Sequence, residues 1–372
     1  MKHTLFTAST AALCAFTALT SRSHASPPQY TVTDLGTLGG DSYAFGINAS
    51  GQVAGYSFLT GNSVDHAVRW ADTTPTDLGT LGGGYSGGYG INASGQVAGV
   101  SHITGNSTTH AAVWTGTTPT DLGTLGGFNS SAHGINDFGQ VAGFSLITGD
   151  SANHAVRWTG LTPTDLGTLG GTSSYAFGIN ASGQVTGYSN IGNDGFSHAF
   201  LYDATGMHDL GTLGGSSSCG YGINASGQVA GFSIITDGSA NHAVRWTGTT
   251  PTDLGTLGGL NSSAGGINAA GDVTGMSYLA GDLTSAAFLY TGGAMYDLNT
   301  LLLPGSGVTG LTVGVGSNIN DFGQIAASGV IGGQTHALLL TPTPEPCSAI
   351  LLLIGGALCL QRRSLRTNER NA

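Results

Sequence analysis

The sequence has few charged residues and almost no positive ones in its central part. Charged residues make up 8% of the 372, and between residues 26 and 343 the only basic side chains are Arg69, Arg157 and Arg245, against 18 Asp. Nucleic-acid binding requires Lys and Arg that neutralise phosphates, and anionic membrane surfaces attract the same side chains. The composition therefore predicts that nucleic acid is not a partner of this region.

Cysteine and proline are also scarce. The four Cys do not form a disulfide framework, since Cys14, Cys347 and Cys359 lie near the ends and Cys219 stands alone in the middle. Their spacing is not that of a metal site. Glycine, in contrast, accounts for 65 residues, without the three-residue period of collagen. Because hydrophobic residues recur at fixed places between the glycines, we expect the glycines to mark many short turns.

Residues 1–25 have the features of a secretory signal peptide. Met1-Lys2-His3 precedes an apolar stretch over residues 5–19, and Ser23-His24-Ala25 has the small residues of a cleavage site. Such a segment directs export and is then removed, here by signal peptidase. We therefore expect the mature chain to begin at Ser26.

The other end, residues 342–372, reads as a second address signal. Pro344-Glu345-Pro346 precedes an apolar segment at 347–361, and Arg362 and Arg363 follow it. A helix of 14 residues would measure about 21 Å, less than the roughly 30 Å core of a bilayer, and the Arg residues would keep its end cytoplasmic. A plain C-terminal anchor helix is one interpretation of this short transmembrane segment.

This end resembles the PEP-CTERM sorting signal of Gram-negative bacteria. The resemblance rests on the Pro-Glu-Pro motif, the apolar run and the Arg cluster, over about 30 residues. It implies processing by an exosortase-type enzyme after export across the inner membrane. It also implies a cell-surface or extracellular location, transient anchoring by the C-terminal segment, and association with exopolysaccharide.

Three sequence markers recur seven times in the central part of the chain. Asp-Leu-Gly-Thr-Leu-Gly-Gly begins at Asp34, Asp77, Asp121, Asp165, Asp209 and Asp253, with a degenerate copy at Asp297. A second marker, Ile-Asn followed by Gly-Gln-Val or a variant, has its Ile at positions 47, 91, 135, 179, 223, 267 and 319. The third, His-Ala-Val-Arg-Trp and its relatives, begins at His66, His110, His154, His198, His242, Ala286 and His336. A repeat of this length is typical of a stacked β architecture.

Each repeat contains four predicted strands and no helical periodicity. In the first repeat the strands are expected at 43–48, 52–59, 66–71 and 76–81, and in the first of them large and small residues alternate with period two. Asn48-Ala49-Ser50-Gly51 has the residues of a tight turn, with a glycine where a left-handed conformation is needed. Four strands in one repeat are the content of a propeller blade.

The two ends of the repeat region predict a closed ring. The Asp-Leu strand at 30–38 precedes the first complete repeat, and the last repeat, 318–340, has only three strands. The two incomplete parts make one sheet if the N-terminal strand joins the last repeat, which leaves no exposed edge. The sequence thus predicts an all-β fold, a seven-bladed β-propeller over residues 26–341 closed by its N-terminal strand. An open β-solenoid is the alternative.

The repeats resemble the HAF repeats of bacterial extracellular proteins. The resemblance rests on His198-Ala199-Phe200, its His-Ala-Val equivalents and the Gly-Ile-Asn and Gly-Gln-Val segments, over residues 30–340. It implies an extracellular repeat protein and no particular chemistry. Blade 6 departs from the pattern with Ala286 in place of His.

The periodic histidines are interpreted as structural. Equivalent third-strand positions would lie roughly 13 Å apart, whereas zinc–nitrogen bonds measure about 2.0–2.1 Å. We expect each ring to bind backbone or a turn Asp in its own blade. The aromatic position of the third strand (Trp70, Trp114, Trp158, Tyr202, Trp246, Tyr290) is interpreted as packing between blades, with a row that stacks on carbohydrate as the alternative.

No catalytic residue, cofactor or metal site is predicted, because nearly every polar side chain has symmetric copies. The sequence favours a non-catalytic exported surface or matrix protein that binds extracellular polysaccharide or the cell envelope. The alternative is an extracellular hydrolase or lyase acting on glycans, which would need unique polar residues in the central channel. A ligand is expected on the face that carries the variable loops, since binding residues ride on loops of rigid scaffolds.

Overall fold

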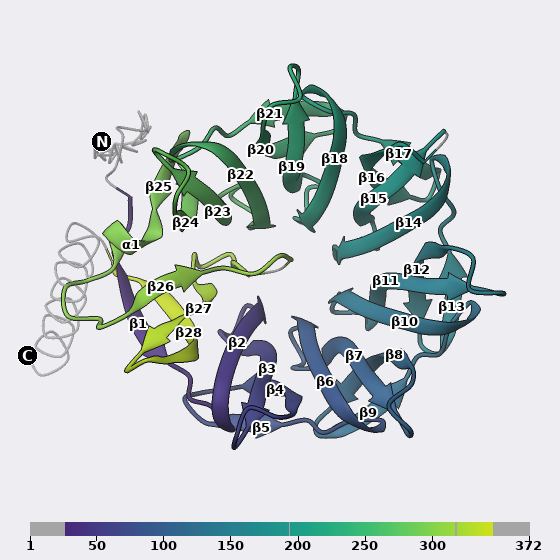
Figure 1. Ribbon diagram of the computed structural model, residues 1–372, viewed down its shortest axis with the longest axis horizontal. Coiled ribbons are helices and arrows are strands. Elements are labelled where there is room, and N and C mark those ends of the chain that lie inside the picture. Colours follow the sequence, from purple (N-terminus) through teal and green to yellow (C-terminus); the bar gives the residue numbers. More distant parts are fainter. Residues whose placement is uncertain (1–26, 193, 317, 345–372) are drawn as a thin grey trace, which may run out of the picture.

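The computed structural model describes residues 27–344, apart from residues 193 and 317, and these form a seven-bladed β-propeller. Seven four-stranded antiparallel sheets stand around a central axis (Figure 1). The predicted fold is confirmed and the open solenoid is wrong, because the first and last strands of the ring share one sheet. The predicted signal peptide and the predicted segment at 347–361 lie outside the described residues.

Blades are numbered along the chain, and their strands are given from the axis outward. Blades 1 to 3 are β2 (Gly39–Ile47), β3 (Val53–Leu59), β4 (Asp65–Trp70) and β5 (Pro75–Asp77); β6 (Gly82–Ile91), β7 (Val97–Ile103), β8 (Thr109–Thr115) and β9 (Thr118–Asp121); β10 (Gly126–Ile135), β11 (Gln140–Ile147), β12 (Asn153–Thr159) and β13 (Thr162–Asp165). Blades 4 to 6 are β14 (Gly170–Ile179), β15 (Val185–Ile191), β16 (Phe196–Asp203) and β17 (Gly206–Asp209); β18 (Gly214–Ile223), β19 (Val229–Ile235), β20 (Asn241–Thr247) and β21 (Thr250–Asp253); β22 (Gly258–Ile267), β23 (Val273–Leu279), β24 (Ser285–Thr291) and β25 (Ala294–Asp297). Blade 7 is β26 (Thr309–Thr312), β27 (Ile325–Ile331), β28 (Gln334–Pro342) and β1 (Tyr30–Asp34).

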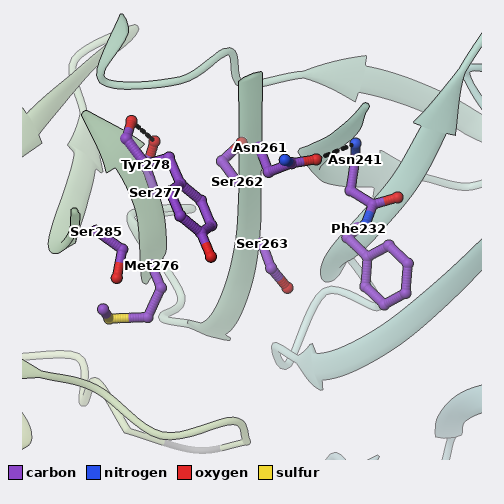
Figure 2. Close-up of a pocket in the computed structure, with 9 residues that line it drawn as sticks. All are labelled: Phe232, Asn241, Asn261, Ser262, Ser263, Met276, Ser277, Tyr278 and Ser285. Carbon is purple, nitrogen blue, oxygen red and sulfur yellow. Dashed lines mark hydrogen bonds between the residues drawn. The ribbon is translucent and has the colours of Figure 1, made fainter. Parts of the chain in front are cut away.

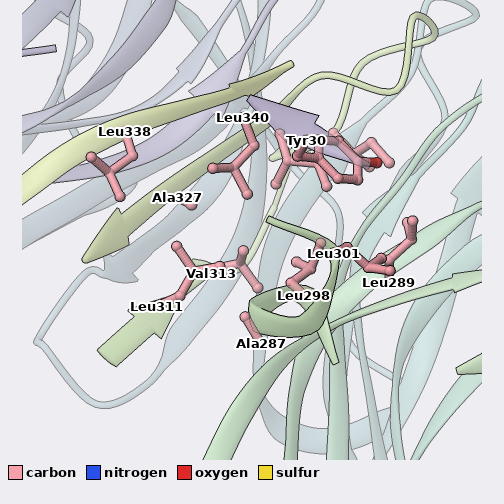
Figure 3. Close-up of a cluster of buried hydrophobic side chains, with 12 residues drawn as sticks. Tyr30, Ala287, Leu289, Leu298, Leu301, Leu311, Val313, Ala327, Leu338 and Leu340 are labelled. Atoms are coloured by element: carbon pink, nitrogen blue, oxygen red, sulfur yellow. The ribbon is translucent and has the colours of Figure 1, made fainter. Parts of the chain in front are cut away.

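The ring is closed by β1, which forms the outer strand of blade 7. Tyr30 pairs with Pro342 and Asp34 with Leu338 in an antiparallel register. The Tyr30 side chain is 1% exposed and belongs to a cluster with Leu298, Leu301, Leu338 and Leu340 (Figure 3). Residues from the two ends of the propeller therefore share one apolar core. The pairing of β1 with β28 also covers a strand edge that would otherwise be free.

The apolar cores lie between neighbouring blades. In one of them Trp158 of blade 3 packs with Ala98 and Ala111 of blade 2, and the indole is fully buried. Trp70, Trp114 and Trp246 are buried to the same degree. Small residues on one blade pack against a large aromatic residue on the next. Each sheet therefore buries its two faces against neighbouring blades, which a single isolated blade could not do.

Seven buried asparagines, one from each blade, form a circle of hydrogen bonds at one end of the axis. The side-chain amide of Asn48 donates to the backbone carbonyl oxygen of Asn92 at 2.9 Å, and the circle ends where Asn320 donates to Asn48 at 3.0 Å. The longest bond in the circle, 3.5 Å, joins Asn268 of blade 6 to Asn320 of blade 7. The members are Asn48, Asn92, Asn136, Asn180, Asn224, Asn268 and Asn320.

Strand limits differ from the prediction in a systematic way. The outer strand was expected at 76–81, but β5 ends at Asp77, and the following residues cross over to the next blade. The Asp77 carboxylate accepts a hydrogen bond from the backbone of Gly79, whose φ of +68° turns the chain out of the sheet. The inner strand β2 begins at Gly39, four residues before the predicted start.

The last blade departs from the repeat in two further places. No helix was expected, yet residues Leu298–Leu301 form one helical turn, α1, because Asn299 replaces the glycine and Asp297 caps the turn through the Asn299 amide. The inner strand was expected near Asn318, but it lies earlier, at Thr309–Thr312. Residues 313–316 then run toward the axis (Figure 1) before Ile319 bridges to Ile325.

Candidate functional site

The two faces of the propeller carry different kinds of connection. Because the strands of a blade alternate in direction, the crossovers between blades and the loops between second and third strands share one face, here called the loop face. The tight turns, such as the one at Asn48 to Gly51, lie on the opposite face. Among the described residues the loop face carries Phe128, Phe196, Leu260, Tyr278 and Leu283, which are large and exposed.

Aromatic rings on the first and second strands of blades 1 to 5 form a belt, and its central members border the axial space. Its central members are adjacent around the axis: ring centroids lie 5.4 Å apart for Phe45 and Tyr89, 5.0 Å for Tyr89 and His133, and 5.2 Å for His133 and Phe177. All are partly exposed. We call the whole set the aromatic belt: Tyr43, Phe45, Tyr56, Phe58, Tyr85, Tyr89, His102, His133, Phe144, Tyr175, Phe177, Tyr188, Tyr221 and Phe232.

The alternation of the inner strand produces the belt. In β2, Tyr43 and Phe45 are partly exposed on one side of the strand, whereas the flanking Ser42, Ala44 and Gly46 are buried. Gly46 has no room for a side chain, because a Cβ there would lie 2.7 Å from the carbonyl oxygen of Tyr89 in the next blade. Neighbouring inner strands can therefore approach closely and bring their aromatic rings into contact.

The belt is interrupted at blades 6 and 7. Blade 6 has Gly265 where blades 1 to 5 have an aromatic ring, and the amide of Gly316 donates to the carbonyl oxygen of Gly265 at 3.1 Å. Val315 and Gly316 help to line an axial cavity of about 150 Å³ together with Phe45, Tyr89, His133 and Phe177. The segment after β26 thus lies beside Gly265, where blade 6 has no ring.

Burial keeps His133, Tyr56 and Tyr188 of the belt uncharged at neutral pH. Burial lowers the pKa of His133 to about 4, and burial raises the pKa of Tyr56 and of Tyr188 to about 12. The imidazole of His133 stacks on Tyr89 at an interplanar angle of 8°, and its Nε2 lies 3.2 Å from the Ser131 hydroxyl. An uncharged aromatic surface suits a neutral ligand.

The periodic histidines lie on the outer half of each blade, away from the belt. His66 Nδ1 is 2.9 Å from Asp77 on the neighbouring outer strand, and His336 is 2.8 Å from Asp34, which ties β1 to β28. The partner is thus the first residue of the Asp-Leu marker on the outer strand, not an Asp in a turn. The same contact occurs at His110, His154, His198 and His242. Within the described residues no group of three or more His, Cys, Asp or Glu could hold a metal ion.

The third-strand arginines connect blades. The Arg69 guanidinium donates to the carbonyl oxygen of Gly95 in the turn of blade 2, at 3.0 Å, and Arg157 and Arg245 make the same contact with Gly183 and Gly271. Each of these side chains therefore joins its blade to the turn of the next one.

Of the predicted sorting-signal residues, the structure describes only Pro344, which is exposed. Glu345, Pro346, Arg362 and Arg363 lie outside the described residues. Over residues 27–344, where the chain is described, no helix has the length and apolar character needed to cross a membrane.

Sequence reasoning missed the aromatic belt as a feature. Its signal was present, because Phe45, Tyr89, His133, Phe177 and Tyr221 all stand two residues before the Ile of the Ile-Asn marker. Attention to the invariant markers obscured this position, whose residue type varies between Phe, Tyr and His.

Comparisons with known proteins find distant similarity to solved structures. No protein-family model and no curated protein matches the chain. Among solved structures, a provisionally assigned TolB from Agrobacterium tumefaciens is 14% identical, with a TM-score of 0.40 over 63% of this chain and 87% of that one. TolB from Acinetobacter baumannii is 12% identical, with a TM-score of 0.45 over 79% and 64%. A provisionally assigned gluconolactonase is 10% identical, with a TM-score of 0.38 over 85% and 93%. At these values the comparisons assign no function to the chain.

Proposed function

We propose that this protein is an exported, non-catalytic propeller that binds neutral polysaccharide at the cell surface or in the extracellular matrix. The aromatic belt is the observation that carries the proposal. Sugar rings present flat C–H faces that pack on aromatic rings, and large partly exposed apolar surfaces mark interaction sites. The belt offers many such rings around one opening.

Charge supports a neutral polymer over an acidic one. Residues 26–343 contain 18 Asp and only three Arg, so the propeller is strongly negative at neutral pH. Polyanions would be repelled over the range of a Debye length, about 8 Å at physiological ionic strength. Each described Arg is also engaged with the turn of a neighbouring blade.

The proposal includes the route that the termini suggest. Residues 1–25 serve as a signal peptide cleaved by signal peptidase, and residues 342–372 serve as a PEP-CTERM-like sorting signal read by an exosortase-type enzyme. The repeats between them are HAF-type repeats. The sequence motifs alone support these assignments.

Retention on polysaccharide tests the function. The purified chain over residues 26–344, which contains all seven sheets, is passed over immobilised exopolysaccharide of the producing bacterium and over neutral and uronic-acid polymers. We expect retention on the neutral polymers, and reduced retention after Phe45→Ala or Phe177→Ala at unchanged circular dichroism. Phe138→Ala, on an exposed turn of the opposite face, is the matched control. Equal elution from every column, with no retention, would overturn the proposal.

A further inference from the structure

The cleft between blades 5 and 6 contains a cavity of about 300 Å³ near the loop face. Phe232 and Asn241 contribute from blade 5, and Ser263, Met276 and Tyr278 from blade 6 (Figure 2). Its volume falls at the lower end of the range for small-molecule sites. None of the residues that line it is Asp, Glu, Lys, Arg or His.

The equivalent cleft between blades 3 and 4, two repeats earlier, shows what fills this space elsewhere in the ring. There Tyr175 occupies the position of Ser263, and its ring lies 4.8 Å from Phe144 and 4.8 Å from Tyr188. The side-chain amide of Asn153 donates to the Tyr175 hydroxyl at 3.0 Å. A six-membered ring with one oxygen directed at an Asn therefore fits this architecture.

The cleft between blades 5 and 6 keeps the surroundings and lacks the ring. Phe232 and Asn241 stand where Phe144 and Asn153 stand in the filled cleft. Ser263 and Met276 are cross-strand partners, as Tyr175 and Tyr188 are. In Figure 2 no hydrogen bond joins the Asn241 side chain to another residue drawn, although its backbone amide donates to Asn261 at 2.9 Å.

We propose that this cleft binds one neutral pyranose unit of a polysaccharide, in the place that Tyr175 fills in the other cleft. Phe232 offers a face for the ring C–H groups. Asn241, Ser263, Tyr278 and Ser285 bring an amide and three hydroxyls around it, more than a phenol could engage and well matched to a ring that bears several hydroxyls. The absence of charge in the lining favours a neutral sugar. This inference rests on the proposed function, for which it supplies a defined subsite.

The test uses substitutions that exchange the two clefts. Ser263→Tyr closes the cleft with the side chain that the equivalent cleft already accommodates, and Tyr175→Ser opens the second cleft. Neutral gluco-, manno- and galacto-oligosaccharides are titrated calorimetrically against the purified protein. We expect Ser263→Tyr to weaken binding about tenfold or more and Asn241→Ala to weaken it by a similar factor, since the first blocks the cleft and the second removes an amide that lines it. Tyr175→Ser should raise the stoichiometry toward two.

The outcomes separate this subsite from the general function. Unchanged oligosaccharide affinity in both Ser263→Tyr and Asn241→Ala, with polysaccharide retention intact, overturns the cleft and leaves the belt as the binding surface. Preference for a tyrosine-containing peptide over every sugar also overturns it. A protein that binds neither polysaccharide nor oligosaccharide overturns both proposals. Ser263→Tyr is expected to melt at or above the temperature of the parent, and Asn241→Ala provides the test independently of that.

Discussion

Blades 1 to 5 and blades 6 and 7 are made from the same repeat but differ where they face the axis and the loop face. The first five place an aromatic ring at the channel position, whereas blade 6 has Gly265 there and blade 7 has the excursion at 313–316. Blade 6 also lacks the His–Asp pair, with Ala286 in place of the His. The regular blades therefore form the scaffold and the belt, whereas blade 6 leaves its cleft with blade 5 open and residues 315 and 316 enter the axial space.

The irregular region also closes the ring, and this gives the largest expected effect. Tyr30→Ala should lower the free energy of unfolding by about 3–5 kcal/mol, as removal of a large buried aromatic does, because the ring leaves the cluster that joins β1, α1 and β28. Trp158→Ala, in a regular interface, should cost a similar amount. Denaturant unfolding measures both.

Tyr30→Phe is the control for closure and should retain most of the stability, because the ring is kept. A cost of Tyr30→Ala below about 1 kcal/mol, far under the range for buried aromatics, would show that β1 is dispensable for the closed propeller.

Acid should destabilise the regular belt through His133. Its pKa is about 4 in the folded protein and about 6.5 in an unfolded chain. Between these two pH values the imidazole is protonated in the unfolded state but not in the folded state. Stability is full above about pH 6.5, and roughly 3 kcal/mol is lost as pH falls to about 4. Thermal melts from pH 7 to pH 4 measure this loss.

His133→Phe places in blade 3 the residue that blades 1 and 4 have at the same position, Phe45 and Phe177. The variant should lose less stability than the parent over the same pH interval. An identical acid profile in parent and variant would place the pH dependence elsewhere.

Gly187→Ala tests the close packing that the regular blades need. A Cβ at Gly187 would overlap the carbonyl oxygen of Tyr175 on the adjacent strand, so we expect a cost of about 1–3 kcal/mol. Blade 7 has Ala327 at the equivalent position, opposite a shorter and displaced inner strand.

Gly195→Ala is the matched control in the same blade, since its Cβ would meet open space. Chemical denaturation should show no loss for this variant. Equal stability of Gly187→Ala and the parent would mean that the inner strands can separate without penalty.

The smallest effect is expected at the periodic histidines. His154→Ala should cost at most about 1 kcal/mol, because the His154–Asp165 pair is partly exposed and such pairs contribute little. Blade 6 already has Ala286 at this position. A double-mutant cycle with Asp165→Asn measures the pair, and a coupling energy several times larger would contradict a modest structural role.

The sequence was sufficient for the architecture because the markers that define a blade are backbone requirements. Asn48 and Gly51 form a turn in blade 1 that their equivalents repeat in every blade. The unpaired strand at residue 30 predicted the closure by β1. The cleft between blades 5 and 6 could not be predicted, since it depends on Ser263 and Met276 replacing a pair of rings across two strands. Such a cleft depends on how side chains from neighbouring blades pack against one another, and the repeat pattern does not show this packing.

The central claim is that neutral polysaccharide binds at the cleft between blades 5 and 6 and on the aromatic belt, and hydrogen–deuterium exchange tests it most directly. The purified protein is compared with and without the neutral polysaccharide that it retains. The account predicts slower exchange at the cleft formed by β19, β20, β22 and β23, with a smaller effect at the inner strands β2 to β18 that carry the belt. Protection confined to the tight-turn face, or spread evenly over all seven blades, would contradict it.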